Sequence, residues 1–350
     1  MTRMLFGPGW LRAFARSCFV GALLFVSPFY PVKAHAQTQI VFASVGGLTD
    51  AGLYLAEELG YFREAGLTVQ MKRIANAPTI LTSVATSQID VAGASITPGM
   101  FTAGPQGIKL RVVGDKQSVR PGFAATRLVV GSALSADKPA QMIHALRGKN
   151  IAISARAGSS FYNVAALLRE NGVPLAEVKI KELSYPNMVA ALTTGAIDAA
   201  YIIEPFLSEV TRKGIATDVS NPGDLAGDGP ARINVPLVYS EKFAANRPAA
   251  EAFMLAYMKG VRVYNDAFLK KIDYEKVVGI LARHSGVEID TVRSSNPAGL
   301  DPNQEINLDS FNAIQAFFVE QGLMQAPAPL GDLIDTSFAR AAVEKLGRYK

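Results

Sequence analysis

The sequence predicts an α/β protein of two lobes, each with a mainly parallel sheet flanked by helices. Short apolar strands alternate with helices over most of the chain, with connections of a few residues, which is typical of parallel sheets covered on both faces. In addition, Ser83–Ala92 (SVATSQIDVA) and Ala191–Ala200 (ALTTGAIDAA) both run from a helix through a polar turn to an Ile-Asp pair and a strand of small residues. This repeat favours two lobes of one design, although helix-turn-strand units recur in any α/β protein.

The composition is that of an ordinary globular protein. The chain has 350 residues, 49% of them hydrophobic and 19% charged, which is enough for two domains with their own cores. The net charge of +5 is unevenly distributed along the chain. Residues 1–36 hold four of the 35 Lys and Arg and no acidic residue, so residues 37–350 have 31 basic against 30 acidic residues. A nearly neutral remainder gives no indication of nucleic acid or anionic membranes as partners.

Residues 1–36 have the pattern of a cleaved secretory signal peptide. A basic start is followed by the uncharged, mostly apolar run Cys18–Val32 and by Ala34-His35-Ala36, a cleavage site of the small-x-small type. Pro28 and Pro31 make the run too short for a membrane anchor. We therefore expect a soluble periplasmic protein without membrane insertion after cleavage. Cys18 is the only cysteine, so the exported chain has no disulfide, thiolate metal site or cysteine nucleophile.

The first part of the chain alternates strictly between strand and helix. Gly60 ends a helix for which Asp50 is a good N-cap, and Pro98 fits the first turn of another. The expected strands are Ile40–Ser44, Thr68–Ile74, Asp90–Ala94 and Lys109–Gly114, and the expected helices are Ala51–Leu59, Pro78–Ser87 and one opened by Ser95–Pro98.

The second part repeats this pattern. Asn171-Gly172 and Gly195 end helices, and Pro205 suits the first position of the next one. The expected strands are Thr126–Val130, Asn150–Ser154, Val178–Leu183 and a short one before Glu204, and the expected helices are Ser159–Glu170, Pro186–Thr194 and one from Phe206 to Lys213.

The end of the chain is mostly helical. The strand Ile233–Tyr239 is expected to return to the first lobe, and the helices Glu251–Phe268, Tyr274–Leu281, Ser310–Gln321 and Phe338–Leu346 to close it. This assigns residues 37–124 plus 236–350 to lobe 1 and residues 125–235 to lobe 2, joined by two crossing strands.

Two helix starts that directly follow strands are candidate ligand sites. Gly158, Ser159 and Ser160 offer free backbone N–H groups and two hydroxyls, a combination suited to an anion, and Ser95 and Thr97 occupy the equivalent place in the first lobe. Since Ser and Thr are also preferred N-caps, simple helix capping is the competing interpretation for these residues.

Three further residues are candidate contacts with a ligand. Tyr185 could supply an aromatic wall, although aromatic residues in helices more often lie in a core. Glu204 could bind an ammonium or amide group, cap its helix or pair with a lysine, and Asp50 could face the pocket or cap its helix. If both carboxylates face the pocket, they disfavour a sulfonate or nitrate through repulsion.

Several segments together resemble the substrate-binding proteins of ABC importers in the nitrate, taurine and alkanesulfonate group, which also includes binders of the thiamine pyrimidine. The segments are Leu53–Val69, the Ile89-Asp90 turn, Leu146–Ile153, Ala157–Ser160 and Ala191–Phe206. The resemblance implies the type II periplasmic-binding-protein fold, a cleft ligand, no cofactor and no catalysis, with a permease and its ATPase subunit as partners of a monomer. It makes a sulfonate, taurine or nitrate-like anion the leading ligand class, with a thiamine-type pyrimidine or an aromatic carboxylate as the alternative.

Two other classes of protein remain as alternatives. A pyrimidine-synthase-like enzyme of the same fold would need iron, histidine and cysteine, whereas the exported chain has no Cys, and His144 and His284 lie in unrelated segments. A sensory module that presents its ligand to a kinase or chemoreceptor would share the fold and the cleft.

Overall fold

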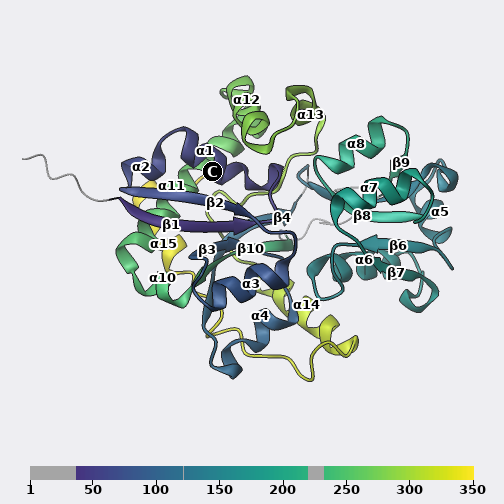
Figure 1. The fold of residues 1–350 in the computed structure, drawn as a ribbon, viewed down its shortest axis with the longest axis horizontal. Coiled ribbons are helices and arrows are strands. Elements are labelled where there is room, and N and C mark those ends of the chain that lie inside the picture. The colour runs from purple at the N-terminus through teal and green to yellow at the C-terminus, as the bar shows by residue number, and fades with distance from the viewer. Residues whose placement is uncertain (1–36, 121, 220–231) are drawn as a thin grey trace, which may run out of the picture. The chain divides into compact units, whose positions relative to one another are not determined.

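The computed structural model describes residues 37–120, 122–219 and 232–350, and these contain two five-stranded sheets with helices around each (Figure 1). The two-sheet α/β architecture predicted from the sequence is confirmed. The expected signal peptide, residues 1–36, lies outside the described residues, as does the Gly/Pro/Asp-rich segment 221–230. No helix in the described part of the chain is long and apolar enough to span a membrane.

The first sheet has the strand order β2-β1-β3-β10-β4. β1 is parallel to β2 and β3, whereas β10 runs antiparallel to both of its neighbours. The strands are β1 (Thr38–Ser44), β2 (Leu67–Arg73), β3 (Val91–Gly93), β4 (Leu110–Val119) and β10 (Arg232–Ser240).

The second sheet has the order β7-β6-β8-β5-β9 and the same pattern of directions. β6 is parallel to β7 and β8, and β5 is antiparallel to β8 and β9. The strands are β5 (Thr126–Gly131), β6 (Asn150–Ile153), β7 (Lys179–Glu182), β8 (Ala199–Ile203) and β9 (Ala216–Asp218), of which β9 was not predicted. Each sheet is thus mainly parallel with one reversed strand.

The connections between the sheets follow β4 and precede β10. β4 extends five residues beyond the predicted end at Gly114, since the polar run Asp115–Ser118 continues to pair with β10. β10 spans the predicted boundary between residues 235 and 236. The assignment of residues 37–124 plus 236–350 and 125–235 to two lobes stays a prediction.

The two copies of the Ile-Asp motif have the same structural role. The Asp90 carboxylate accepts a hydrogen bond of 2.8 Å from the backbone N–H of Val41, where β1 runs beside β3. The Asp198 carboxylate accepts one of 2.8 Å from the N–H of Asn150, where β6 runs beside β8. This matched contact, together with the matched strand order, supports two lobes of one design.

Helices cover both faces of the sheets. They are α1 (Ala51–Glu58), α2 (Tyr61–Glu64), α3 (Ala77–Ala85), α4 (Pro98–Thr102), α5 (Pro139–His144), α6 (Ser159–Glu170), α7 (Tyr185–Thr193), α8 (Phe206–Arg212), α10 (Glu241–Ala245), α11 (Arg247–Lys270), α12 (Tyr274–Ser285), α13 (Ile289–Ser294), α14 (Leu308–Glu320) and α15 (Ser337–Leu346). α2, α5, α10 and α13 have no counterpart among the predicted helices, and Pro205 precedes α8 instead of occupying its first position.

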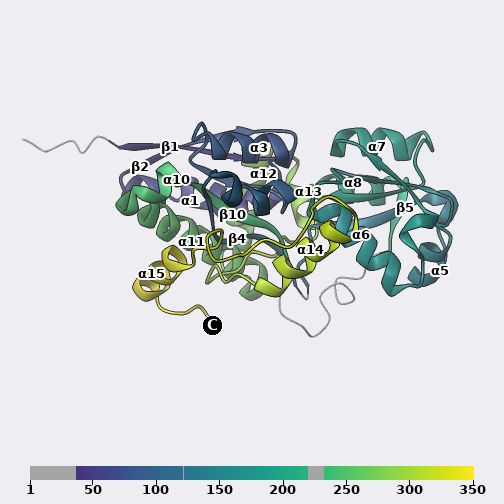
Figure 2. The ribbon, with the colours of Figure 1, turned by 90° about the horizontal axis from the view of Figure 1, so that it is seen from below.

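The buried side chains form separate layers on the two faces of each sheet. In the first sheet, α1 and α11 pack on the face of Phe42, and α3 and α4 pack on the face of Ala43 (Figure 1). α7 and α8 cover one face of the second sheet. α14, from the end of the chain, lies beside α6 (Figure 2), and the rings of Phe317 and Phe161 meet edge to face at 5.0 Å.

Gly260 allows the close approach of α11 to α1. A Cβ at this position would lie 2.2 Å from the carbonyl oxygen of Gly52 and 2.8 Å from the backbone nitrogen of Ala56. Since no heavy atom can occupy that space, a side chain at residue 260 would force the two helices apart.

Candidate functional site

A cavity of about 50 Å³ is lined by residues of both sheets and of their helices. That volume exceeds the roughly 10–15 Å³ that one water molecule needs. Its polar lining comes from Thr49, Asn76, Ser95, Lys116, Gln117, Thr126, Ser154, Ser159, Ser160, Asn163, Tyr185, Tyr201 and Asn234. Its position matches the expectation that ligands of α/β sheets bind beyond the ends of strands.

The start of α6, where the sequence predicts a ligand site at Gly158, Ser159 and Ser160, lines this cavity. The two hydroxyls, however, have partners within the protein. Ser159 donates a hydrogen bond of 2.9 Å to the carbonyl oxygen of Asn234 in β10, and Ser160 donates one of 3.3 Å to that of Ala155. The donors that this helix start offers to a ligand are therefore its backbone N–H groups, which a helix leaves without intrahelical partners.

In the equivalent segment before α4, the two candidates Ser95 and Thr97 have different positions relative to the cavity. Ser95 lines the cavity, whereas Thr97 is not among the lining residues. The Thr97 hydroxyl oxygen accepts a hydrogen bond of 3.2 Å from the backbone N–H of Met100 and so caps α4. The structure thus gives Thr97 the capping role.

Asp50 does not cap α1 with its side chain, contrary to the more favoured prediction. It is 3% exposed, lies behind the cavity wall, and forms an ion pair of 2.6 Å with Lys116. Its other carboxylate oxygen accepts a hydrogen bond of 2.6 Å from Ser44. The Lys116 ammonium also donates a hydrogen bond of 2.9 Å to the hydroxyl of Thr49. The pairing of a carboxylate with lysine, considered for Glu204, therefore occurs at Asp50.

Glu204 is fully buried and does not line the cavity. Its carboxylate accepts hydrogen bonds from the backbone N–H and the hydroxyl of Ser208, both 3.0 Å long. Asn296 donates two more, from its backbone N–H at 2.8 Å and its side-chain amide at 3.0 Å. The carboxylate thus binds the first turn of α8 to the segment that follows α13.

Tyr185 lines the cavity together with Tyr201. Burial raises the pKa of the Tyr185 hydroxyl, and a hydrogen bond with Ser154 partly offsets that rise. The hydroxyl is therefore neutral at pH 7. Two aromatic side chains at one cavity give a flat ligand a surface to pack against.

The sequence did not identify the polar residues of the crossing strands and their neighbours as candidates. The amide of Gln117 in β4 donates a hydrogen bond of 3.0 Å to Thr126 in β5, and that of Asn163 donates one of 2.8 Å to Asn234 in β10. A signal was present, because Asp115–Ser118 places four polar residues between an apolar strand and Pro121. Among the described lining residues, Lys116 is the only charged one.

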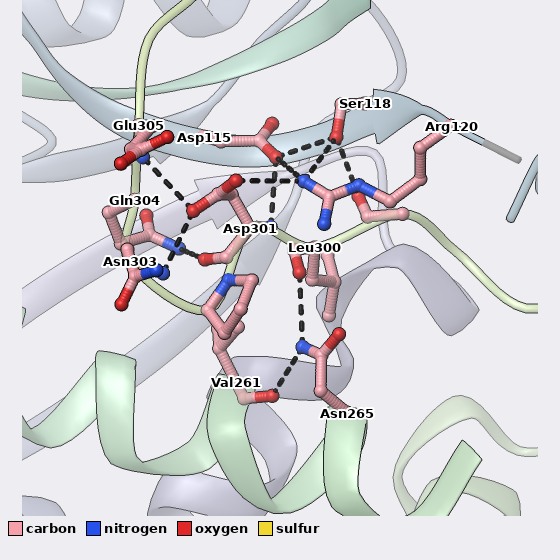
Figure 3. Close-up of polar contacts among 12 residues, drawn as sticks. Asp115, Ser118, Arg120, Val261, Asn265, Leu300, Asp301, Asn303, Gln304 and Glu305 are labelled. Carbon is pink, nitrogen blue, oxygen red and sulfur yellow. Dashed lines mark hydrogen bonds and ion pairs between the residues drawn. The ribbon is translucent and has the colours of Figure 1, made fainter. Parts of the chain in front are cut away.

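A polar cluster surrounds Asp115 of β4, next to these residues (Figure 3). Asp115 is 1% exposed and accepts hydrogen bonds from the Ser118 hydroxyl at 2.7 Å and the backbone N–H of Asp301 at 3.0 Å. Arg120 lies 3.8 Å from it and 3.0 Å from the carboxylate of Asp301. Burial raises the pKa of Asp115 to about 7, because the Arg120 charge only partly offsets the loss of solvation and the neighbouring Asp301 charge adds to the rise.

Two sheets of matched topology, joined by crossing segments and sharing one polar cavity, define the two-lobed periplasmic-binding-protein fold. The chain belongs to the NMT1/THI5-like family, whose model matches residues 49–266. Among the described residues, no group of three or more His, Cys, Asp and Glu side chains is arranged to hold a metal ion.

Known proteins with a similar sequence or fold include both binding proteins and an enzyme. The taurine-binding periplasmic protein of Escherichia coli (strain K12) is 25% identical over 232 residues, 65% of this chain and 67% of that protein. The alkanesulfonate-binding protein SsuA from Xanthomonas axonopodis pv. citri, solved with MOPS bound, aligns with a TM-score of 0.66 and 22% identity over 86% of this chain and 98% of its own. The desulfurization enzyme DSZB aligns with a TM-score of 0.60 and 15% identity over 89% of this chain and 100% of its own. The fold by itself is therefore compatible with binding and with catalysis.

Proposed function

We propose that this protein is a periplasmic solute-binding protein that captures a small polar organic ligand and delivers it to the permease and ATPase subunits of an ABC importer. The cavity lined from both sheets carries this proposal. A sulfonate, taurine or nitrate-like anion is the leading ligand class, since the cationic residue Lys116 and the first turn of α6 both line the cavity. In this proposal residues 1–36 direct export, and the protein acts as a monomer without catalysis.

A second ligand class is a thiamine-type pyrimidine or an aromatic carboxylate. Tyr185 and Tyr201, which line the same cavity, favour it because they offer aromatic rings for packing.

A thermal-shift screen of residues 37–350 tests the proposal. The compounds are sulfonates, nitrate, thiamine-type pyrimidines, aromatic carboxylates and amino compounds. A ligand at about a hundred times its dissociation constant adds about 2.7 kcal/mol to the free energy of unfolding, which raises the melting temperature clearly. Stabilisation confined to anions supports the leading class. Stabilisation confined to pyrimidines or amines rejects it, and no stabilisation by any compound contradicts the binding role.

Two further measurements separate binding for transport from the other classes. Mass spectrometry of the ligand after prolonged incubation should recover it unchanged, whereas an enzyme would convert it. Affinity capture with ligand present should retain a permease, whereas a sensory module would retain a kinase or chemoreceptor.

A further inference from the structure

Lys116 is held in the cavity wall by contacts on every part of its side chain. Its stem lies along β3 at Gly93, where a Cβ would come within 2.8 Å of the Lys116 Cδ and Cε atoms. Its ammonium is fixed between the carboxylate of Asp50 at 2.6 Å and the hydroxyl of Thr49 at 2.9 Å. The lysine and aspartate side chains are 1% and 4% exposed, so solvent screens this ion pair weakly.

The ammonium retains a donor for a molecule in the cavity. A lysine has three N–H donors. Within the described residues the Lys116 ammonium donates one hydrogen bond, to Thr49, and forms one ion pair, with Asp50, so at least one donor is left for a ligand. Lys116 lines the cavity, whereas Asp50 lies behind it. An anionic oxygen in the cavity would therefore be closer to the ammonium than to the carboxylate and would be attracted overall, since Coulomb energy falls with distance.

The ion pair also limits the charge that the cavity accepts. Asp50 cancels the charge of Lys116, so the wall carries no net charge. A cationic ligand would find no negatively charged partner among the described lining residues. A dianion would lose the hydration of its second charge and find no second positively charged side chain there in exchange.

We propose that Lys116 is a specificity-determining contact that donates a hydrogen bond from its remaining N–H to the single anionic group of the ligand, and that Asp50 is the residue that positions it. This inference rests on the proposed binding function and narrows the ligand to a monoanion.

Matched acid and amide probes test the charge contact separately from shape. The pairs are ethanesulfonate with ethanesulfonamide and benzoate with benzamide, and sulfate serves as a dianion. Calorimetry on the wild-type protein should show at least tenfold tighter binding of one acid than of its amide, in line with the strength of a hydrogen bond to a charged group.

Lys116→Met should weaken binding of that acid at least tenfold and change binding of the amide less than threefold, so the acid preference disappears. The double variant Lys116→Met with Asp50→Asn should lose the acid preference in the same way. It avoids leaving a buried unpaired carboxylate that could unfold the protein. Asp50→Asn alone should improve sulfate binding relative to the monoanion, an effect that a purely structural role of Asp50 would not produce.

Arg127→Gln is the control, because it removes an ion pair of 2.7 Å with Asp218 outside the cavity lining. It should preserve the acid preference. If a folded double variant also keeps the wild-type acid preference, Lys116 is a structural residue and the inference is wrong while the binding function stands. If the wild-type protein binds no acid probe but binds other compounds of the screen, the monoanion class is wrong. If it binds nothing, the proposed function fails as well.

Discussion

The carboxylate of Glu204, at the end of β8, accepts hydrogen bonds from both the backbone and the side chain of Asn296, which follows α13. Residue 204 directly follows β8 of the second sheet, whereas residue 296 lies more than 50 residues beyond β10, the last strand of the first sheet. This contact joins the end of β8 to a segment outside the second sheet, at a point separate from the chain connections next to β4 and β10.

Glu204→Ala is expected to lower the free energy of unfolding by about 3 kcal/mol or more, because it leaves the buried donors of Ser208 and Asn296 without acceptors. Urea unfolding measures this loss. The ligand affinity of the folded variant should change little, since Glu204 does not line the cavity. A large loss of affinity without loss of stability would instead place its carboxylate at the ligand.

Asp115 is expected to make the free energy of unfolding fall as pH rises. Its pKa is about 7 in the folded protein and 3.8 without burial, so between these values the unfolded chain has released a proton that the folded protein keeps. Stability is therefore lost across that window, by up to about 1.4 kcal/mol per pH unit.

The test of Asp115 is urea unfolding between pH 4.5 and 7.5. The difference between wild type and Asp115→Asn isolates this group from Arg120 and Asp301, whose charges face residue 115 in both proteins. The variant should gain stability relative to wild type as pH rises. A constant difference across the range would contradict the raised pKa.

Ser159→Ala is expected to lower the free energy of unfolding by about 1 kcal/mol, because the carbonyl of Asn234 loses its donor. Ser160→Ala should cost no more than this, since its two hydrogen bonds, with Ala155 at 3.3 Å and Ser154 at 3.1 Å, are both longer than the 2.9 Å bond of Ser159. Thermal unfolding of both variants checks this order. Weaker ligand binding with unchanged stability in both would show that the hydroxyls face the ligand instead.

Gly260→Ala is expected to lower the free energy of unfolding by about 1–3 kcal/mol, because the added methyl group overlaps the backbone of α1. Gly279→Ala in α12 is the matched control, since its Cβ would meet only a flexible arginine atom at 3.7 Å. It should be neutral or stabilising by up to about 1 kcal/mol, from the better helix propensity of alanine. Equal effects in denaturant unfolding would contradict the close packing of α1 and α11.

Asp90→Ala and Asp198→Ala are expected to destabilise the protein by similar amounts, about 1–3 kcal/mol each, because each removes a charged acceptor from a neighbouring strand. Because the sites lie in different sheets, the double variant should show the sum of the two losses in urea unfolding. A strongly unequal pair would argue against equivalent roles of the two motifs.

Helices and strands that have a clear pattern within their own stretch of sequence could be predicted. Periodicity and helix-ending glycines located α6 and α7 within one residue at each end, and the Ile-Asp motif indicated the relation between the two sheets. β9 was missed because Ala216–Asp218 has only three residues, too few for a periodic pattern. Its pairing with β5 is a tertiary contact that no local pattern shows.

The polar contacts of the site were harder to predict than its location. Asp50 is an ordinary N-cap residue in sequence, and its actual partner Lys116 lies 66 positions later on a strand that was expected to end at Gly114. In the same way, Ser159 fits a helix start, but the carbonyl that takes its hydrogen bond comes from the returning strand. Long-range pairing decides which polar group faces a ligand and which is used internally.

The strand order has a consequence for synthesis on the ribosome. All five strands of the second sheet lie in one continuous stretch, residues 126–218, whereas β10 must insert between β3 and β4 to complete the first sheet. While the chain emerges, β3 and β4 therefore lack the partner that joins them until residue 240 has been made. The second sheet can therefore assemble first. The first sheet, although four of its strands are made earlier, is completed last.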